Sequence, residues 1–143
     1  MTALDRPPAT LTITKINPKG DEFVEVTNGM KEIVSLQNWS FEIQGYIVML
    51  PQYYLRSGKA VRIHLGIGQG NETDLFLDCD LELNDTVGNV SLRDDSGEKV
   101  ASLDYRTKLD GSIATSLTIF GHPGSGAGTI VQNVDDQKRA GSM

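Results

Sequence analysis

The clearest pattern in the chain is an alternation of apolar and polar positions, which is typical of strands with one buried face. Over residues 21–50, Val24 and Val26 alternate with polar side chains, and a second apolar series runs at every other position from Trp39 to Ile43. Because this tryptophan is the only one in the chain, we expect it to lie in the core. No stretch shows the period of an amphipathic helix.

Turn-forming residues separate the expected strands at intervals of roughly ten residues. Asn17–Gly20 combines a proline of fixed φ with a permissive glycine, and Asn28-Gly29 offers two residues that tolerate positive φ. Asp94–Gly97 is a polar turn that ends in glycine, and we expect it to close a hairpin. About eight or nine antiparallel strands with this spacing predict an all-β, immunoglobulin-like β-sandwich.

The pattern also predicts how the chain is divided. We expect the sandwich domain to span 10–120, with a core that closes near Tyr105 and one more strand over 113–120. Residues 1–9 contain two adjacent prolines and no apolar run, which predicts a disordered lead-in. Residues 121–143 are rich in glycine, serine and other polar residues, which predicts a flexible tail.

Length, charge and cysteine content exclude several classes of protein and of partner. A chain of 143 residues is long enough for one domain with a real core, and its net charge of −6 opposes binding to nucleic acid or to anionic lipid. No stretch is long and apolar enough to span a membrane, and the first residues do not form a signal peptide. The single cysteine, Cys79, excludes an internal disulfide. These features leave the compartment and the oligomeric state open.

Several segments stand in an order that is known from one family. They are Ile16–Asn28, Val34–Trp39, Leu55–Val61, Leu83–Asp85, Val90–Asp94, Gly97 and Tyr105. Together they resemble the lamin tail domain family, whose members are immunoglobulin-like β-sandwiches in nuclear lamins and in many bacterial and archaeal proteins. The likeness covers about residues 10–105. Within it, the amino-acid sequence resembles the prokaryotic members of the family more than the lamins.

The resemblance implies a non-catalytic interaction or accessory module, often appended to other domains in prokaryotes. The chain departs from the family at Thr86–Asn89, which stands where a Gly-Asp pair usually precedes the Val-x-Leu strand. The basic surface and the coiled-coil rod of the lamins are also missing. We therefore do not expect the DNA or chromatin binding that is attributed to lamin tails.

Acidic residues gather in one stretch that is the candidate metal site. Hard carboxylate oxygens are the ligands that Ca²⁺ prefers. Their spacing matches no EF-hand loop, and acids that alternate with leucines are also what a solvated strand face contains. We give that second interpretation more weight, and we expect no cofactor. The calcium candidates are Asp74, Asp78, Asp80 and Asp85, with Glu82 between them.

Aromatic residues around one expected loop, 51–58, are the candidate interaction site. Tyr53 and Tyr54 lie in that loop and Tyr46 lies shortly before it. Exposed aromatic side chains give contact area at low entropic cost and are enriched at interfaces, although one of them can instead cover an end of the sandwich. An open sandwich can also accept a partner strand at a sheet edge.

The remaining candidates for chemistry are weak. His64 and His122 belong to no set of metal ligands, and Cys79 has no activating motif around it. The glycine-rich run Gly66–Gly70 is not followed by a helix, so it does not predict a phosphate loop. We therefore expect no catalytic residues. The leading hypothesis is a non-catalytic module that binds a protein partner, and the alternative is a calcium- or carbohydrate-binding accessory domain of a secreted multidomain protein.

Overall fold

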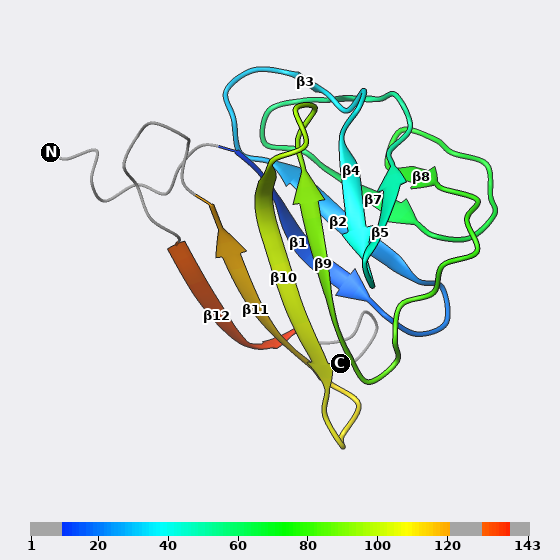
Figure 1. The fold of residues 1–143 in the computed structure, drawn as a ribbon, viewed down its shortest axis with the longest axis vertical. Coiled ribbons are helices and arrows are strands. Elements are labelled where there is room, and N and C mark those ends of the chain that lie inside the picture. Colours follow the sequence, from blue (N-terminus) through cyan, green and yellow to red (C-terminus); the bar gives the residue numbers. More distant parts are fainter. Residues whose placement is uncertain (1–9, 121–129, 138–143) are drawn as a thin grey trace, which may run out of the picture.

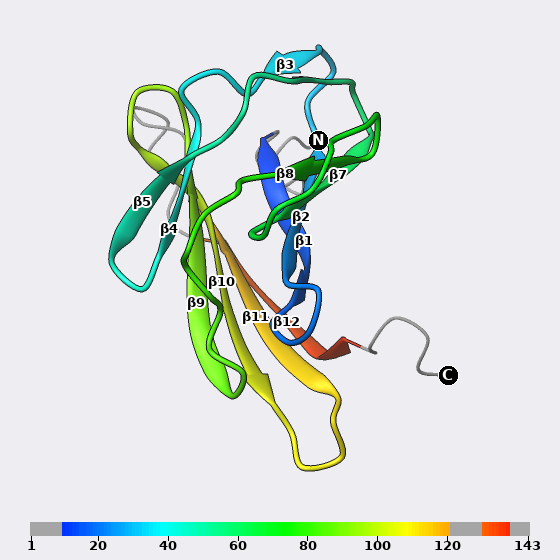
Figure 2. The same cartoon turned by 90° about the vertical axis from the view of Figure 1, so that its right-hand side faces the viewer.

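The computed structural model describes residues 10–120 and 130–137, and within them every regular element is a β-strand. Two sheets lie face to face and enclose one core, as the edge view in Figure 2 shows. The all-β sandwich class predicted from the alternating pattern is confirmed. The described residues include no helix able to cross a membrane. The expected lead-in, 1–9, lies outside the described part of the chain.

The first sheet has four strands. In spatial order they are β1 (Leu11–Asn17), β2 (Phe23–Asn28), β7 (Ala60–His64) and β8 (Asp74–Phe76). The first three are antiparallel, whereas β8 runs parallel to β7 after the loop between them. The register of β1 shifts between Ile13 and Lys15. The next buried side chain after Ile13 is therefore Ile16 and not Lys15, which strict alternation would bury.

The second sheet has six strands, all antiparallel to their neighbours (Figure 1). In spatial order they are β12 (Ile130–Gln137), β11 (Ile113–Ile119), β10 (Lys99–Thr107), β9 (Val87–Arg93), β4 (Ser40–Ile43) and β5 (Tyr46–Met49). Gln44 and Gly45, with φ of 54° and 84°, close the β4–β5 hairpin, a geometry in which both central residues need positive φ. The hairpin expected across Asp94–Gly97 is present between β9 and β10.

The C-terminal part of the chain differs from the sequence expectation. Residues 130–137, expected to be flexible, form β12 and pair with β11. Their polar composition gave no sign of this, because backbone hydrogen bonds to a neighbouring strand do not depend on side-chain polarity. The core does not close near Tyr105, since Ile113 and Ile119 of β11 are also buried. Residues 121–129 and 138–143 lie outside the described residues.

A short ladder closes one end of the sandwich. It pairs β3 (Val34–Ser35) with β6 (Tyr54–Leu55). These short strands, the three-residue β8 and the added β12 account for an element count above the eight or nine strands expected from the sequence. Trp39 follows β3 and is only 8% exposed within the core, as predicted.

Asn28 and Gly29 do not form the turn that the sequence indicates. Neither has positive φ, and Asn28 is fully buried at the end of β2. Its Nδ2 donates to the carbonyl oxygens of Glu32 (2.9 Å) and Leu55 (2.8 Å). Its Oδ1 accepts from the Met30 N–H (2.7 Å). The amide therefore joins β2, the following loop and β6.

We expect Asn28→Ala to lower the free energy of unfolding by about 3 kcal/mol, because buried donors and acceptors are left without partners. Urea denaturation monitored by tryptophan fluorescence measures this loss. Asn17→Ala is the matched control, since the Asn17 side chain makes an exposed hydrogen bond to the Asp21 carbonyl, and we expect a loss below about 1 kcal/mol. Equal losses in the two variants would contradict the role given to Asn28.

Candidate interaction surfaces

A buried histidine lies on the outer face of the four-stranded sheet. His64 is only 6% exposed, although its strand position faces away from the core between the sheets. Its ring stacks on Phe76, with centroids 4.4 Å apart, and also contacts Phe23 at 5.4 Å. The pairing of β2, β7 and β8 places these three rings side by side. The aromatic neighbours therefore remove His64 from solvent.

Both ring nitrogens of His64 face carboxylates. Nδ1 lies 3.0 Å from Oδ1 of Asp21, and Nε2 lies 2.7 Å from Oδ1 of Asp74. An ionised carboxylate only accepts hydrogen bonds, so both contacts form together when both ring nitrogens carry a hydrogen. The hydrogen bond from His64, with a smaller effect from Thr73, lowers the pKa of Asp74. The Arg62 guanidinium, 3.3 Å from Asp74, adds a further positive charge.

The glycine-rich loop between β7 and β8 covers this group. A Cβ at Gly68 would come within 2.4 Å of the Phe76 ring, so only glycine allows the loop to lie this close. Asn71 Oδ1 accepts hydrogen bonds from the N–H groups of Thr73 and Asp74, which fixes the turn into β8. The loop leads into a strand and holds the stacked rings in place. Packing against Phe76 therefore explains the glycine at position 68.

The histidine network has a structural role. Asp21 lies in the turn before β2, and Asp74 begins β8, so the imidazole connects two segments that are far apart in sequence. Because each ring nitrogen already has a carboxylate partner, neither is free to act as a base or a metal ligand in this arrangement. The sequence analysis did not find this network. The only local signal was a histidine at an outward position of an otherwise regular strand.

The four candidate calcium ligands do not come together. Asp74 belongs to the histidine network, and Asp78 has a left-handed backbone with φ of 51°. Asp80 and Asp85 line a pocket of about 580 Å³ together with Glu82. In the part of the chain with described side chains, no three His, Cys, Asp or Glu residues are placed to hold a metal ion.

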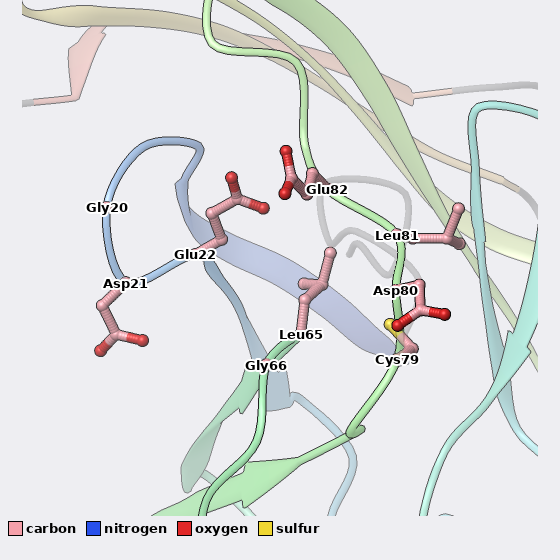
Figure 3. Close-up of a pocket in the computed structure, with 9 residues that line it drawn as sticks. All are labelled: Gly20, Asp21, Glu22, Leu65, Gly66, Cys79, Asp80, Leu81 and Glu82. Carbon is pink, nitrogen blue, oxygen red and sulfur yellow. The ribbon is translucent and has the colours of Figure 1, made fainter.

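A neighbouring pocket of about 340 Å³ is also acidic (Figure 3). Figure 3 shows the carboxylates of Glu22 and Glu82 pointing toward one another, whereas Asp21 points away from them. Burial is the main cause of the raised pKa of Glu22, and the charge of Glu82 adds to it. A hydrogen bond of 2.7 Å from the Leu83 N–H opposes this rise. Negative charge is therefore concentrated along the segment before β9.

The three candidate tyrosines fall on two surfaces. Tyr46 lies on β5 and is 62% exposed, while Tyr54 lies on β6 and is 66% exposed. Tyr53 is half-buried, and its hydroxyl donates to the Glu72 carbonyl. Burial is the main cause of its raised pKa. Tyr53 and Tyr54 line one pocket, whereas Tyr46 belongs to the separate β4–β5 hairpin.

We expect His64→Ala to lower the free energy of unfolding by about 2–4 kcal/mol, because it leaves a cavity and removes the hydrogen-bonding partner that Asp21 and Asp74 share. The measurement is urea denaturation at neutral pH. Arg62→Ala is the comparison, since that side chain is half exposed and its ion pair with Asp74 should contribute less than about 1 kcal/mol. A larger loss for Arg62→Ala than for His64→Ala would be evidence against the network.

The lowered pKa of Asp74 predicts a pH dependence. A carboxyl with a lower pKa in the folded state stabilises the protein above its unfolded pKa of about 3.9, and this stabilisation is lost as pH falls through the folded value. Near neutral pH, wild type should therefore be more stable than Asp74→Asn by an amount that does not depend on pH. Below about pH 4, this difference in stability should become smaller. Thermal melts from pH 7 to pH 2.5 test this. A difference that does not change with pH would refute the assignment.

No family model matches the sequence, and no curated protein is similar to it. The two-sheet fold agrees with the sandwich class in general. The resemblance to the lamin tail domain family thus stays a prediction from the ordered segments in residues 10–105.

Proposed function

We propose that this chain is a non-catalytic protein-interaction module of the lamin-tail type, which binds an extended segment of a partner protein along the edge strand β5. The observation that supports this function is the contrast between β5 and the other sheet edges. A strand edge with free N–H and C=O groups is a template for pairing, and proteins usually protect such edges with charges, bulges or short strands.

Three of the four edges of the two large sheets have such protection. β1 has a shifted register and carries Lys15, and β8 is only three residues long. β12 pairs with β11 in an irregular register. The fourth edge, β5, reads Tyr-Ile-Val-Met and contains no charge, proline or register shift. This edge alone among the four lacks a device against pairing.

Exposed apolar side chains make β5 suitable for a partner strand. Ile47 and Met49 are each 54% exposed, and Tyr46 is exposed as well. Because side chains alternate along a strand, Ile47 and Met49 lie on one face and Tyr46 and Val48 on the other. An added strand would form backbone hydrogen bonds with β5 and apolar contacts on both faces, which is the mode of β-strand addition.

Charge near the hairpin favours a basic partner. The Gln44 side chain donates to the Glu82 carbonyl (2.9 Å), which brings the acidic segment 80–85 beside the β4–β5 turn. Asp80, Glu82 and Asp85 line the pocket there. Electrostatic complementarity then selects an apolar segment flanked by lysine or arginine. The net charge of −6 disfavours a second copy of this chain as the partner.

A defined peptide tests the proposal. The probe is Lys-Val-Thr-Val-Thr-Val-Thr-Val-Lys, and the controls are the same peptide with N-methylated amides or with glutamate in place of both lysines. Of the three peptides, we expect only the unmodified one to shift the NMR amide signals of β5. Pairing needs the N–H groups of the peptide, and the acidic segment favours its lysine charges. Shifts centred on other strands, or equal effects from all three peptides, would contradict the proposal.

Two variants of the protein complete this test. Ile47→Lys with Met49→Lys should weaken binding of the peptide by about tenfold or more, because it places charge on the apolar edge. Leu109→Lys is the matched control, since Leu109 is an exposed apolar residue in the β10–β11 turn and should leave binding unchanged. If wild type instead forms dimers in sedimentation experiments and the β5 variant does not, the occupant is a second copy and the assignment of a basic partner is wrong.

A further inference from the structure

A pocket separate from β5 opens between β6 and the turn that precedes β8. Its volume is about 530 Å³, within the range of sites that bind small molecules. The strand edge β5 does not contribute to this pocket, and the histidine network shares only Thr73 with it. Its principal lining residues are Tyr53, Tyr54, Arg56, Lys59, Glu72 and Thr73.

A tight turn holds two cationic residues together in this pocket. The Lys59 N–H donates to the Arg56 carbonyl (3.0 Å), so the two are the first and fourth residues of a β-turn. Gly58 supplies the positive φ of 75° that the turn requires, and its N–H donates to the Asn28 carbonyl (2.8 Å). The Ser57 hydroxyl bonds the Met30 carbonyl. The backbone of the turn that carries Arg56 and Lys59 is therefore fixed, and both side chains line the pocket.

The two cations, Arg56 and Lys59, outnumber Glu72, the one carboxylate that lines this pocket. Both are exposed, and none of the ion pairs in the described residues includes Arg56 or Lys59. Arg56 lies near enough to the Tyr53 phenol to oppose the rise of its pKa. Like charges held side by side repel one another, and an anion placed between them removes that repulsion. In a chain of net charge −6, this pair marks a local site for one negative group.

The other lining groups define the rest of the ligand. The Tyr54 ring is largely exposed and offers a flat apolar face. The Tyr53 hydroxyl uses its hydrogen on the Glu72 carbonyl and keeps lone pairs to accept a hydrogen bond. The Glu72 carboxylate accepts hydrogen bonds but repels a second negative charge. The pocket thus suits a ligand with one anionic group, several hydroxyl groups and an apolar ring face.

From this combination we infer that the pocket binds a carbohydrate that contains a uronic acid. The sugar carboxylate pairs with Arg56 and Lys59, and the C–H face of the ring stacks on Tyr54. Sugar hydroxyl groups donate to Glu72 and to the Tyr53 oxygen. Glu72 and the overall negative charge disfavour polyanions such as nucleic acids, and also peptides that carry several acidic residues. This inference does not depend on strand addition at β5.

Isothermal titration with methyl galacturonoside, which carries a single carboxylate, tests the site, with its methyl ester as the neutral control of the same ring shape. We expect the ester to bind at least about tenfold more weakly, because it lacks the charge for the Arg56–Lys59 pair. NMR signals of Tyr54 and of the Arg56–Lys59 turn should shift with the acid. Equal binding of acid and ester, or no binding of the acid or of methyl glucuronoside up to about 10 mM, would overturn the inference.

Variants separate the parts of the site. Arg56→Gln and Lys59→Gln should each weaken binding of the acid about fivefold, and should leave binding of the ester unchanged. Tyr54→Ala should weaken binding of both sugars. Arg106→Gln, an exposed cation on β10, is the control and should change neither. If a hexaglutamate peptide or inorganic phosphate binds as tightly as the sugar and with the same dependence on these variants, the ligand class is wrong.

Discussion

The buried amide of Asn28 is the interaction on which the end of the sandwich around β3 and β6 depends. Its side chain bonds the loop after β2 and the Leu55 carbonyl, and its own carbonyl accepts from Gly58. A buried polar group that is fully bonded favours one conformation, because any alternative leaves a donor or an acceptor without a partner. The 56–59 turn and the pocket beside it therefore take their geometry from one residue of β2.

Local pattern was enough to predict those parts of the fold that depend on burial along a single strand. The alternation at Val24 and Val26 and the position of Trp39 matched the structure, and so did the hairpin turn at Asp94–Gly97. Features set by contacts between distant segments were missed. Residues 130–137 form a strand because β11 offers them a partner. Gly29 is needed because a Cβ there would lie 2.8 Å from the Thr10 carbonyl oxygen.

In the candidate sites too, features set by local pattern could be predicted and features set by distant contacts could not. The exposure of Tyr46 and Tyr54 could be predicted from sequence, because they stand beside turns and at the end of apolar runs. The bonds of His64 could not, since they follow from the registers of β2 and β8 against β7. The acidic stretch looked like one cluster in the sequence. In the structure Asp74 belongs to the histidine network, whereas Asp80 and Asp85 line a pocket elsewhere.

The pairing of β4 with β9 has a consequence for how the domain folds. The ion pair between Glu42 and Arg93 joins residues 51 positions apart, whereas the β4–β5 and β9–β10 hairpins are local. Closing so long a loop costs entropy before any contact compensates for it, and non-local sheets fold slowly for this reason. The two hairpins should therefore form first, and the pairing of β4 with β9 should follow later. During that interval both edges of the β4–β5 hairpin are open, so folding speed sets the time in which the chain is vulnerable to misassembly.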